Sequence, residues 1–157
     1  VEKKCLLLRS NACPGDIIFV SGELGGSISG KHLKFTPRIK EARFLSRNFK
    51  VNAMTDISDG LAQDLKHILD KSNVGAVIYE GLIPLSAQAR NLSDALNSGE
   101  DFELLFTLCL KQARKLLKIK KFRFQPIGEI VEARHGFKLI DKKYRAINIR
   151  SRGYRHF

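Results

Sequence analysis

Short apolar runs alternate along this chain with stretches of helical spacing, and this alternation constrains the fold more than any other feature. The apolar runs, which are typical of buried strands, cover residues 16–21, 51–55, 74–79, 102–108, 124–131 and 137–141. Helical patterns cover residues 37–48, 59–71, 86–96 and 111–121. Strands that alternate with helices predict an α/β (α+β) fold, in which helices pack on a mixed β-sheet.

The chain is long enough for one domain with a core and too short for two, because it has 157 residues, of which 43% are hydrophobic. No repeat or linker interrupts it, so residues 1–157 are expected to form a single domain. It begins with Val1 rather than methionine, which suggests a fragment or a processed product. No apolar run approaches the roughly 18 residues that span a bilayer, so no membrane partner is expected.

The cysteines Cys5, Cys13 and Cys109 are odd in number and lack the spacing of metal ligands. This argues against both a disulfide framework and a zinc site, and it favours a reducing cytoplasm.

The net charge of +12 raises the possibility of nucleic-acid binding through phosphate contacts. The densest basic cluster, residues 111–121, has the pattern of an amphipathic helix with a solvated outer face. Aromatic residues do not alternate with basic ones in a stacking register, so a specific nucleic-acid partner is not expected.

Two acids and a hydroxyl lie where the run 51–55 turns into the next helical pattern: Asp56, Ser58 and Asp59. Ser58 or Asp59 is a natural N-cap, and capping alone is one interpretation. Capping needs only one such residue, however, and Mg²⁺ prefers carboxylate oxygens together with substrate phosphates. Free amides at the helix start would add affinity for an anion. The corner therefore also fits a site for a metal and a phosphate.

A glycine-rich segment, residues 25–31, satisfies most of the P-loop pattern, but His32 stands where the magnesium-binding hydroxyl belongs. A glycine-rich turn that leads into a short helix is the better interpretation, with glycines that permit positive φ.

Three further features carry possible function. Glu100 and Asp101 precede an expected strand, at the kind of sheet edge where ligands bind, although acids in such loops are usually only solvated. Tyr154 and Phe157 lie in the terminal segment and must pack on the core or on a flat ligand. His67 has no ligand or nucleophile pattern around it and is expected to be a structural or surface residue.

These segments, in this order, resemble thiamine-monophosphate kinases, specifically their carboxy-terminal half. The similar segments are 7–12, 14–16, 22–25 with Ser27, 37–38, 54–61, 64–68, 83–84, 99–104 and 153–157, and together they extend over essentially the whole chain. Departures from the family pattern are Asn11 and Ser98 in place of glycines, Phe102 in place of tyrosine, and Thr55 before the corner.

The resemblance implies ATP-dependent phosphorylation of thiamine monophosphate to thiamine diphosphate by direct transfer with magnesium ions. By the same resemblance, Asp56 and Asp59 are expected to bind Mg²⁺, while Arg9 and Ser58 contact ATP. Glu100 is expected to contact the thiamine phosphate, and Tyr154 or Phe157 its rings.

The family's amino-terminal domain, which forms the homodimer and supplies further metal ligands, is not in this chain. The chain is therefore expected to be an incomplete enzyme that is inactive alone. The alternative is a noncatalytic nucleotide- or metal-binding module that associates with a separately encoded partner.

Overall fold

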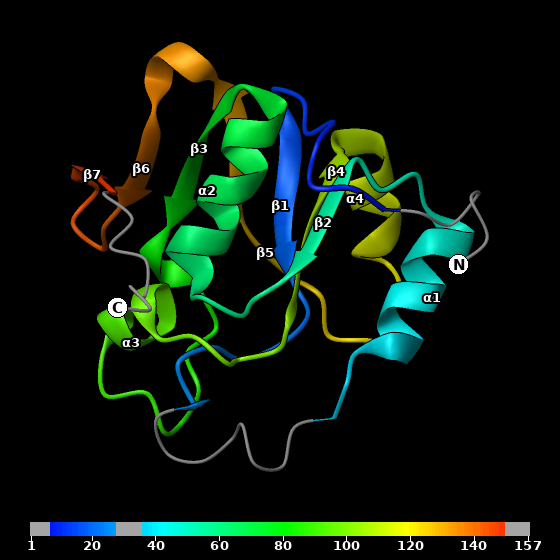
Figure 1. The fold of residues 1–157 in the computed structure, drawn as a ribbon, viewed down its shortest axis with the longest axis horizontal. Helices are drawn as coiled ribbons and strands as arrows, with labels where there is room; N and C mark the ends of the chain where they lie inside the picture. Colours follow the sequence, from blue (N-terminus) through cyan, green and yellow to red (C-terminus); the bar gives the residue numbers. More distant parts are fainter. Residues whose placement is uncertain (1–6, 28–35, 150–157) are drawn as a thin grey trace.

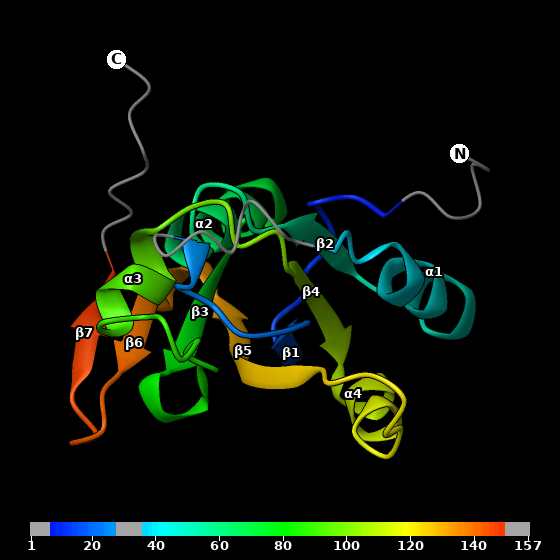
Figure 2. The same cartoon turned by 90° about the horizontal axis from the view of Figure 1, so that it is seen from below.

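Seven strands form one sheet in the computed structural model, which describes residues 7–27 and 36–149 (Figures 1 and 2). The sheet order is β2-β4-β1-β5-β3-β6-β7, and only the β3–β6 pair is parallel among these strands. The strands are β1 (Asp16–Val20), β2 (Ala53–Asp56), β3 (Val74–Tyr79), β4 (Leu104–Cys109), β5 (Gln125–Glu132), β6 (Phe137–Ile140) and β7 (Ala146–Asn148).

The α-helices of the described part are α1 (Ile39–Asn48), α2 (Leu61–Ser72), α3 (Leu92–Asn97) and α4 (Leu110–Leu116). Single 3₁₀ turns, η4 (Glu80–Leu82) and η5 (Ala133–His135), follow β3 and β5. In Figure 2, α2 and α4 lie on opposite sides of the sheet. Across the described ranges, no helix has the length and apolarity needed to cross a membrane.

The alternation of side chains along β1 divides the core into two clusters, because successive residues of a strand point to opposite faces. Ile18 and Val20 belong to the cluster that includes the apolar face of α2. Phe19 belongs to the other cluster, where its ring stacks on that of Phe106 at a centroid distance of 5.4 Å. That second cluster includes Leu45 of α1 and residues of α4. The sheet is thus covered on both faces near its β1 and β4 strands.

The mixed sheet with packed helices confirms the predicted fold class, and each expected strand is present with ends that shift by up to two residues. The helix expected over residues 86–96 is shorter, however, because only Leu92–Asn97 is helical. The backbone of residues 84–86 pairs instead with Leu24, whose N–H donates to the carbonyl of Pro84. Asn91 then caps α3, its side chain accepting a hydrogen bond from the N–H of Asp94.

Strand β7 is not among the predicted elements, and α4 ends five residues before the expected position. All three residues of β7 are exposed, so the strand carries no burial pattern that a sequence could reveal. After α4, the chain turns so that the N–H of Ile119 bonds to the carbonyl of Leu116.

Leu65 packs at the centre of the α2 cluster with 0% exposure, so we expect Leu65→Ala to lower the free energy of unfolding by about 2–5 kcal/mol. Leu117→Ala is the matched control, because Leu117 is 55% exposed and its truncation should change stability by less than about 0.5 kcal/mol. Urea unfolding measures both. Equal effects of the two substitutions would contradict this description of the core.

Candidate active site

The corner between β2 and α2 is held by a residue outside it, Asp64 in the first turn of α2. One carboxylate oxygen of Asp64, Oδ2, accepts hydrogen bonds from the backbone N–H groups of Ser58 and Asp59, each at 2.9 Å. Asp64 is only 1% exposed. Burial raises the pKa of its carboxyl group, while the two amide hydrogen bonds oppose this shift.

The interpretation that Ser58 or Asp59 caps α2 is wrong. The N-cap is Gly60, with φ of 103°, and it makes no side-chain capping bond. Only glycine adopts this φ easily, which is why the chain can turn sharply here and enter the helix two residues later than predicted. Because Asp64 binds the corner's amides, the side chains of Ser58 and Asp59 are not used for capping.

The predicted metal ligands therefore keep their carboxylates available. Asp56 is the last residue of β2 and is exposed, and Asp59 is half-buried. Within the described ranges, neither carboxylate forms a hydrogen bond or an ion pair. An open pocket beside Asp56 is lined by Pro37, Arg38 and Phe102 among others.

The loop that carries Glu100 is fixed to this corner by backbone hydrogen bonds. The N–H of Glu100 donates to the carbonyl of Ser58, and the N–H of Phe102 donates to the carbonyl of Ile57, both at 2.9 Å. Glu100 and Phe102 have φ of 64° and 52°, values that non-glycine residues adopt at a cost of about 1–3 kcal/mol each. The structure thus holds exposed Glu100 next to Ser58, although 42 positions separate them in the sequence.

The acids beside Glu100 are structural, and the interpretation that such acids are only solvated is wrong for them. Asp101 and Glu103 are each 1% exposed. Asp101 accepts a hydrogen bond of 2.8 Å from the N–H of Gly25, whose φ of 81° agrees with the glycine-rich turn expected there. Residues 28–31 of that segment, and His32, lie outside the described residues.

Glu103 binds Arg38 through two hydrogen bonds of 2.8 Å, one from Nε and one from Nη2. The Glu103 carboxylate is the main reason that the pKa of Arg38 is raised, and Ser21 donates a further hydrogen bond to it. This ion pair ties the start of α1 to the strand that follows the Glu100 loop.

Arg9 lies beside the end of β2. Its Nε donates to the hydroxyl of Thr55 at 3.1 Å, and the carbonyl of Leu8 accepts the N–H of Met54. The structure therefore brings Arg9, the Asp56–Asp59 corner and Glu100 to one edge of the sheet. Tyr154 and Phe157 lie outside the described residues.

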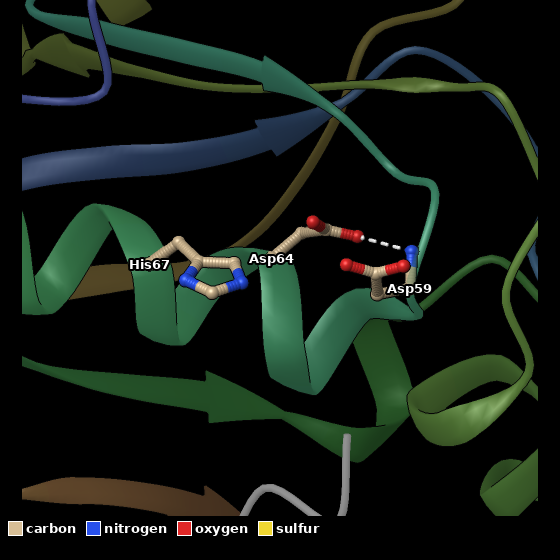
Figure 3. A group of neighbouring side chains, drawn as sticks. All are labelled: Asp59, Asp64 and His67. Carbon is tan, nitrogen blue, oxygen red and sulfur yellow. Dashed lines mark hydrogen bonds between the residues drawn. The ribbon is translucent and has the colours of Figure 1, made fainter. Parts of the chain in front are cut away.

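A group that the sequence analysis did not identify lies at the same corner: Asp59, Asp64 and His67 (Figure 3). One potential ligand atom from each residue lies within 4.8 Å of the others. The signal in the sequence was the spacing of Asp64 and His67, which places both on one face of α2. Asp56 is not a member of this group.

Comparisons with known proteins concern the family and the fold of the chain. Residues 15–141 match the family model described as AIR synthase related protein, C-terminal domain. The thiamine-monophosphate kinase of Buchnera aphidicola subsp. Acyrthosiphon pisum is 39% identical over 188 positions, which cover 100% of this chain and 57% of that protein. The chain thus spans just over half the length of this curated relative.

Solved structures show the same fold. AaThiL complexed with AMPPCP and TMP has a TM-score of 0.76 and 26% identity, over 96% of this chain and 54% of that one. Escherichia coli HypE has a TM-score of 0.77 at 20% identity, over 92% of this chain and 52% of that one, and this likeness concerns the fold alone.

A substitution of Gly99 tests how closely the loop fits the corner, because a Cβ at this position would lie 2.3 Å from the carbonyl oxygen of Ser58. We expect Gly99→Ala to push the loop away, to lower the melting temperature and to expose the N–H of Glu100 to exchange. Gly81→Ala is the control, since a Cβ there would meet nothing within 4 Å. If the hydrogen-exchange rate of the Glu100 amide is the same in Gly99→Ala as in the unmodified chain, the docking of the loop is contradicted.

Proposed function

Because this chain belongs to the family of AIR synthase related proteins, as their C-terminal domain, we propose that it is the carboxy-terminal half of a thiamine-monophosphate kinase. Such an enzyme transfers the γ-phosphoryl group of ATP to thiamine monophosphate and forms thiamine diphosphate. The 39% identity to a protein of that name, along the whole chain, supports this activity over others in the family.

One structural observation carries the proposal: the backbone bond between Glu100 and Ser58. It joins the residue proposed to contact the thiamine phosphate to the residue proposed to contact ATP. Phosphoryl transfer requires the attacking oxygen and the γ-phosphate to lie in line and close together. A loop fixed to the corner by main-chain bonds is suited to hold two substrates in such an arrangement.

Each side chain at this edge has a proposed role. Arg9 binds a phosphate of ATP, which its exposure and its position beside Thr55 support. Asp56 and Asp59 would hold Mg²⁺, since their oxygens have no partner in the described ranges and a hard cation prefers carboxylates. When bound, the ion would neutralise negative charge on the transferred phosphoryl group.

The remaining parts of the proposed site lie beyond these residues. The ring of Tyr154 or Phe157 would pack against thiamine, and the rest of the enzyme would supply further metal ligands and the homodimer contacts. The coverage of 57% of the Buchnera relative leaves room for such a part. We place the enzyme in the cytoplasm, which the free thiols of Cys13 and Cys109 support.

We expect the purified chain to form no ADP above background from ATP, Mg²⁺ and thiamine monophosphate, because phosphoryl transfer depends on the joint geometry of all its ligands. A coupled assay for ADP measures this. Sustained ADP formation would overturn the proposal that the site is completed elsewhere. Absence of activity in a full-length protein containing this chain would favour the noncatalytic binding module instead.

In such a full-length protein, Asp56→Asn should lower kcat at least about a hundredfold, because it removes a charge that would hold the metal against the phosphates. The melting temperature should change little, since Asp56 is exposed and makes no bond in the described ranges. Asp70→Asn is the control, because Asp70 is exposed at the far end of α2 and pairs with Lys66. Turnover of Asp56→Asn equal to that of Asp70→Asn would contradict the metal-ligand role.

A further inference from the structure

The two oxygens of the buried Asp64 carboxylate have different surroundings. Oδ2 accepts hydrogen bonds from the N–H groups of Ser58 and Asp59, whereas Oδ1 is buried and has no hydrogen-bond partner among residues 7–27 and 36–149. A buried carboxylate oxygen without a partner costs free energy, because it has lost its water and gained nothing in exchange. The backbone amides of the corner thus satisfy one oxygen of Asp64, and a bound ligand would satisfy the other.

Two further groups that can bind a cation surround this carboxylate. Asp59 precedes α2, and His67 follows Asp64 by one helical turn, so its ring lies on the same face of the helix. Figure 3 shows the Asp59 carboxylate beside the Asp64 carboxylate, with the His67 ring further along α2. The three ligand atoms lie within 4.8 Å of one another.

We infer that Asp59, Asp64 and His67 form a binding site for a divalent first-row transition-metal ion. An imidazole nitrogen together with two carboxylates favours ions from Mn²⁺ to Zn²⁺ over Mg²⁺, which prefers oxygen alone. Bonds of about 2.1 Å place the ligand atoms of one ion roughly 3 to 4.2 Å apart. The half-buried side chain of Asp59, which makes no bond in the described ranges, closes the remaining distance by rotating.

The surroundings of the three ligands are those of a prepared metal site. The amides of Ser58 and Asp59 orient the Asp64 carboxylate, as outer hydrogen bonds orient metal ligands in general. The side-chain nitrogen of Gln63 lies 3.2 Å from Nε2 of His67 and holds the ring on this face of α2. An ion bound through Nε2 displaces this amide, whereas an ion bound through Nδ1 leaves the ring proton on Nε2, so that Gln63 must turn its side-chain oxygen toward the ring to accept it.

This site does not depend on the proposed kinase activity, although Asp59 takes part in both. Asp56, at the end of β2, separates the two: it is a proposed magnesium ligand and is not one of these three residues. Metal binding measured without substrates, and compared between His67 and Asp56 variants, therefore separates this inference from the proposed kinase activity.

The test is a calorimetric titration of the 157-residue chain with Co²⁺, repeated with Mg²⁺. We expect one Co²⁺ site that binds at least about tenfold more tightly than Mg²⁺. His67→Gln and Asp59→Asn should each weaken Co²⁺ binding by about tenfold or more, since even outer partners of metal ligands contribute about that much. His67 is half-buried on a helix surface, so its substitution should leave the fold intact, which circular dichroism checks.

His135→Gln is the matched control: it removes an exposed histidine of η5 and should leave Co²⁺ affinity within twofold of the original. Asp56→Asn tells the two sites apart, because it removes a proposed magnesium ligand and none of the three residues of this site. Equal affinity of His67→Gln and the unmodified chain would overturn the inference, as would the absence of Co²⁺ binding. Loss of the site in Asp56→Asn would also overturn it and would place the ion at the proposed magnesium site.

Discussion

The pairing of β2 with β4 continues beyond the ends of both strands, and the arrangement of the site depends on this continuation. The regular ladder ends where Asp56 pairs with Leu104. Three more main-chain bonds then join Ile57 and Ser58 to the segment from Glu100 to Glu103, at 2.8 to 2.9 Å. Main-chain bonds fix positions without using side chains. The exposed acids at this edge, Asp56 and Glu100, therefore remain available to bind ions and ligands.

Buried carboxylates stabilise the same edge of the sheet, whereas the more exposed carboxylates there remain accessible to ligands. Asp64 binds corner amides, Asp101 binds the N–H of Gly25, and Glu103 pairs with Arg38. Removing water from a carboxylate is unfavourable unless amides or a guanidinium replace it, and each of these three acids has such a partner. They hold strained residues such as Glu100 in place, whereas Asp56, Asp59 and Glu100 keep oxygens that solvent can reach.

Local patterns predicted the fold class, the positions of the strands and the corner at Asp56, because burial imposes a period of 2 or 3.6 on the residues themselves. The docking of Glu100 on Ser58 could not be predicted from local patterns, since it joins two loops that are far apart in the sequence through main-chain atoms, which every residue has. Strand β7 was missed because its three residues are exposed. Asp64 was missed as the organiser of the corner, since an acid in the first turn of a helix is common for electrostatic reasons alone.

The position of Asp64 also explains why a glycine is needed at residue 60. For its carboxylate to reach the N–H groups of Ser58 and Asp59, the chain must fold back over the first turn of α2. Gly60 permits this with φ of 103°. A Cβ at this position would lie only 2.9 Å from the carbonyl oxygen of Leu96, so there is no room for a side chain. A side chain at residue 60 would therefore meet both backbone strain and a clash with the end of α3. The orientation of Asp59 thus depends on helix α3, on the turn at Gly60 and on the carboxylate of Asp64. A substitution in any of these three parts should shift the backbone of the corner and so change the position of the proposed metal ligands.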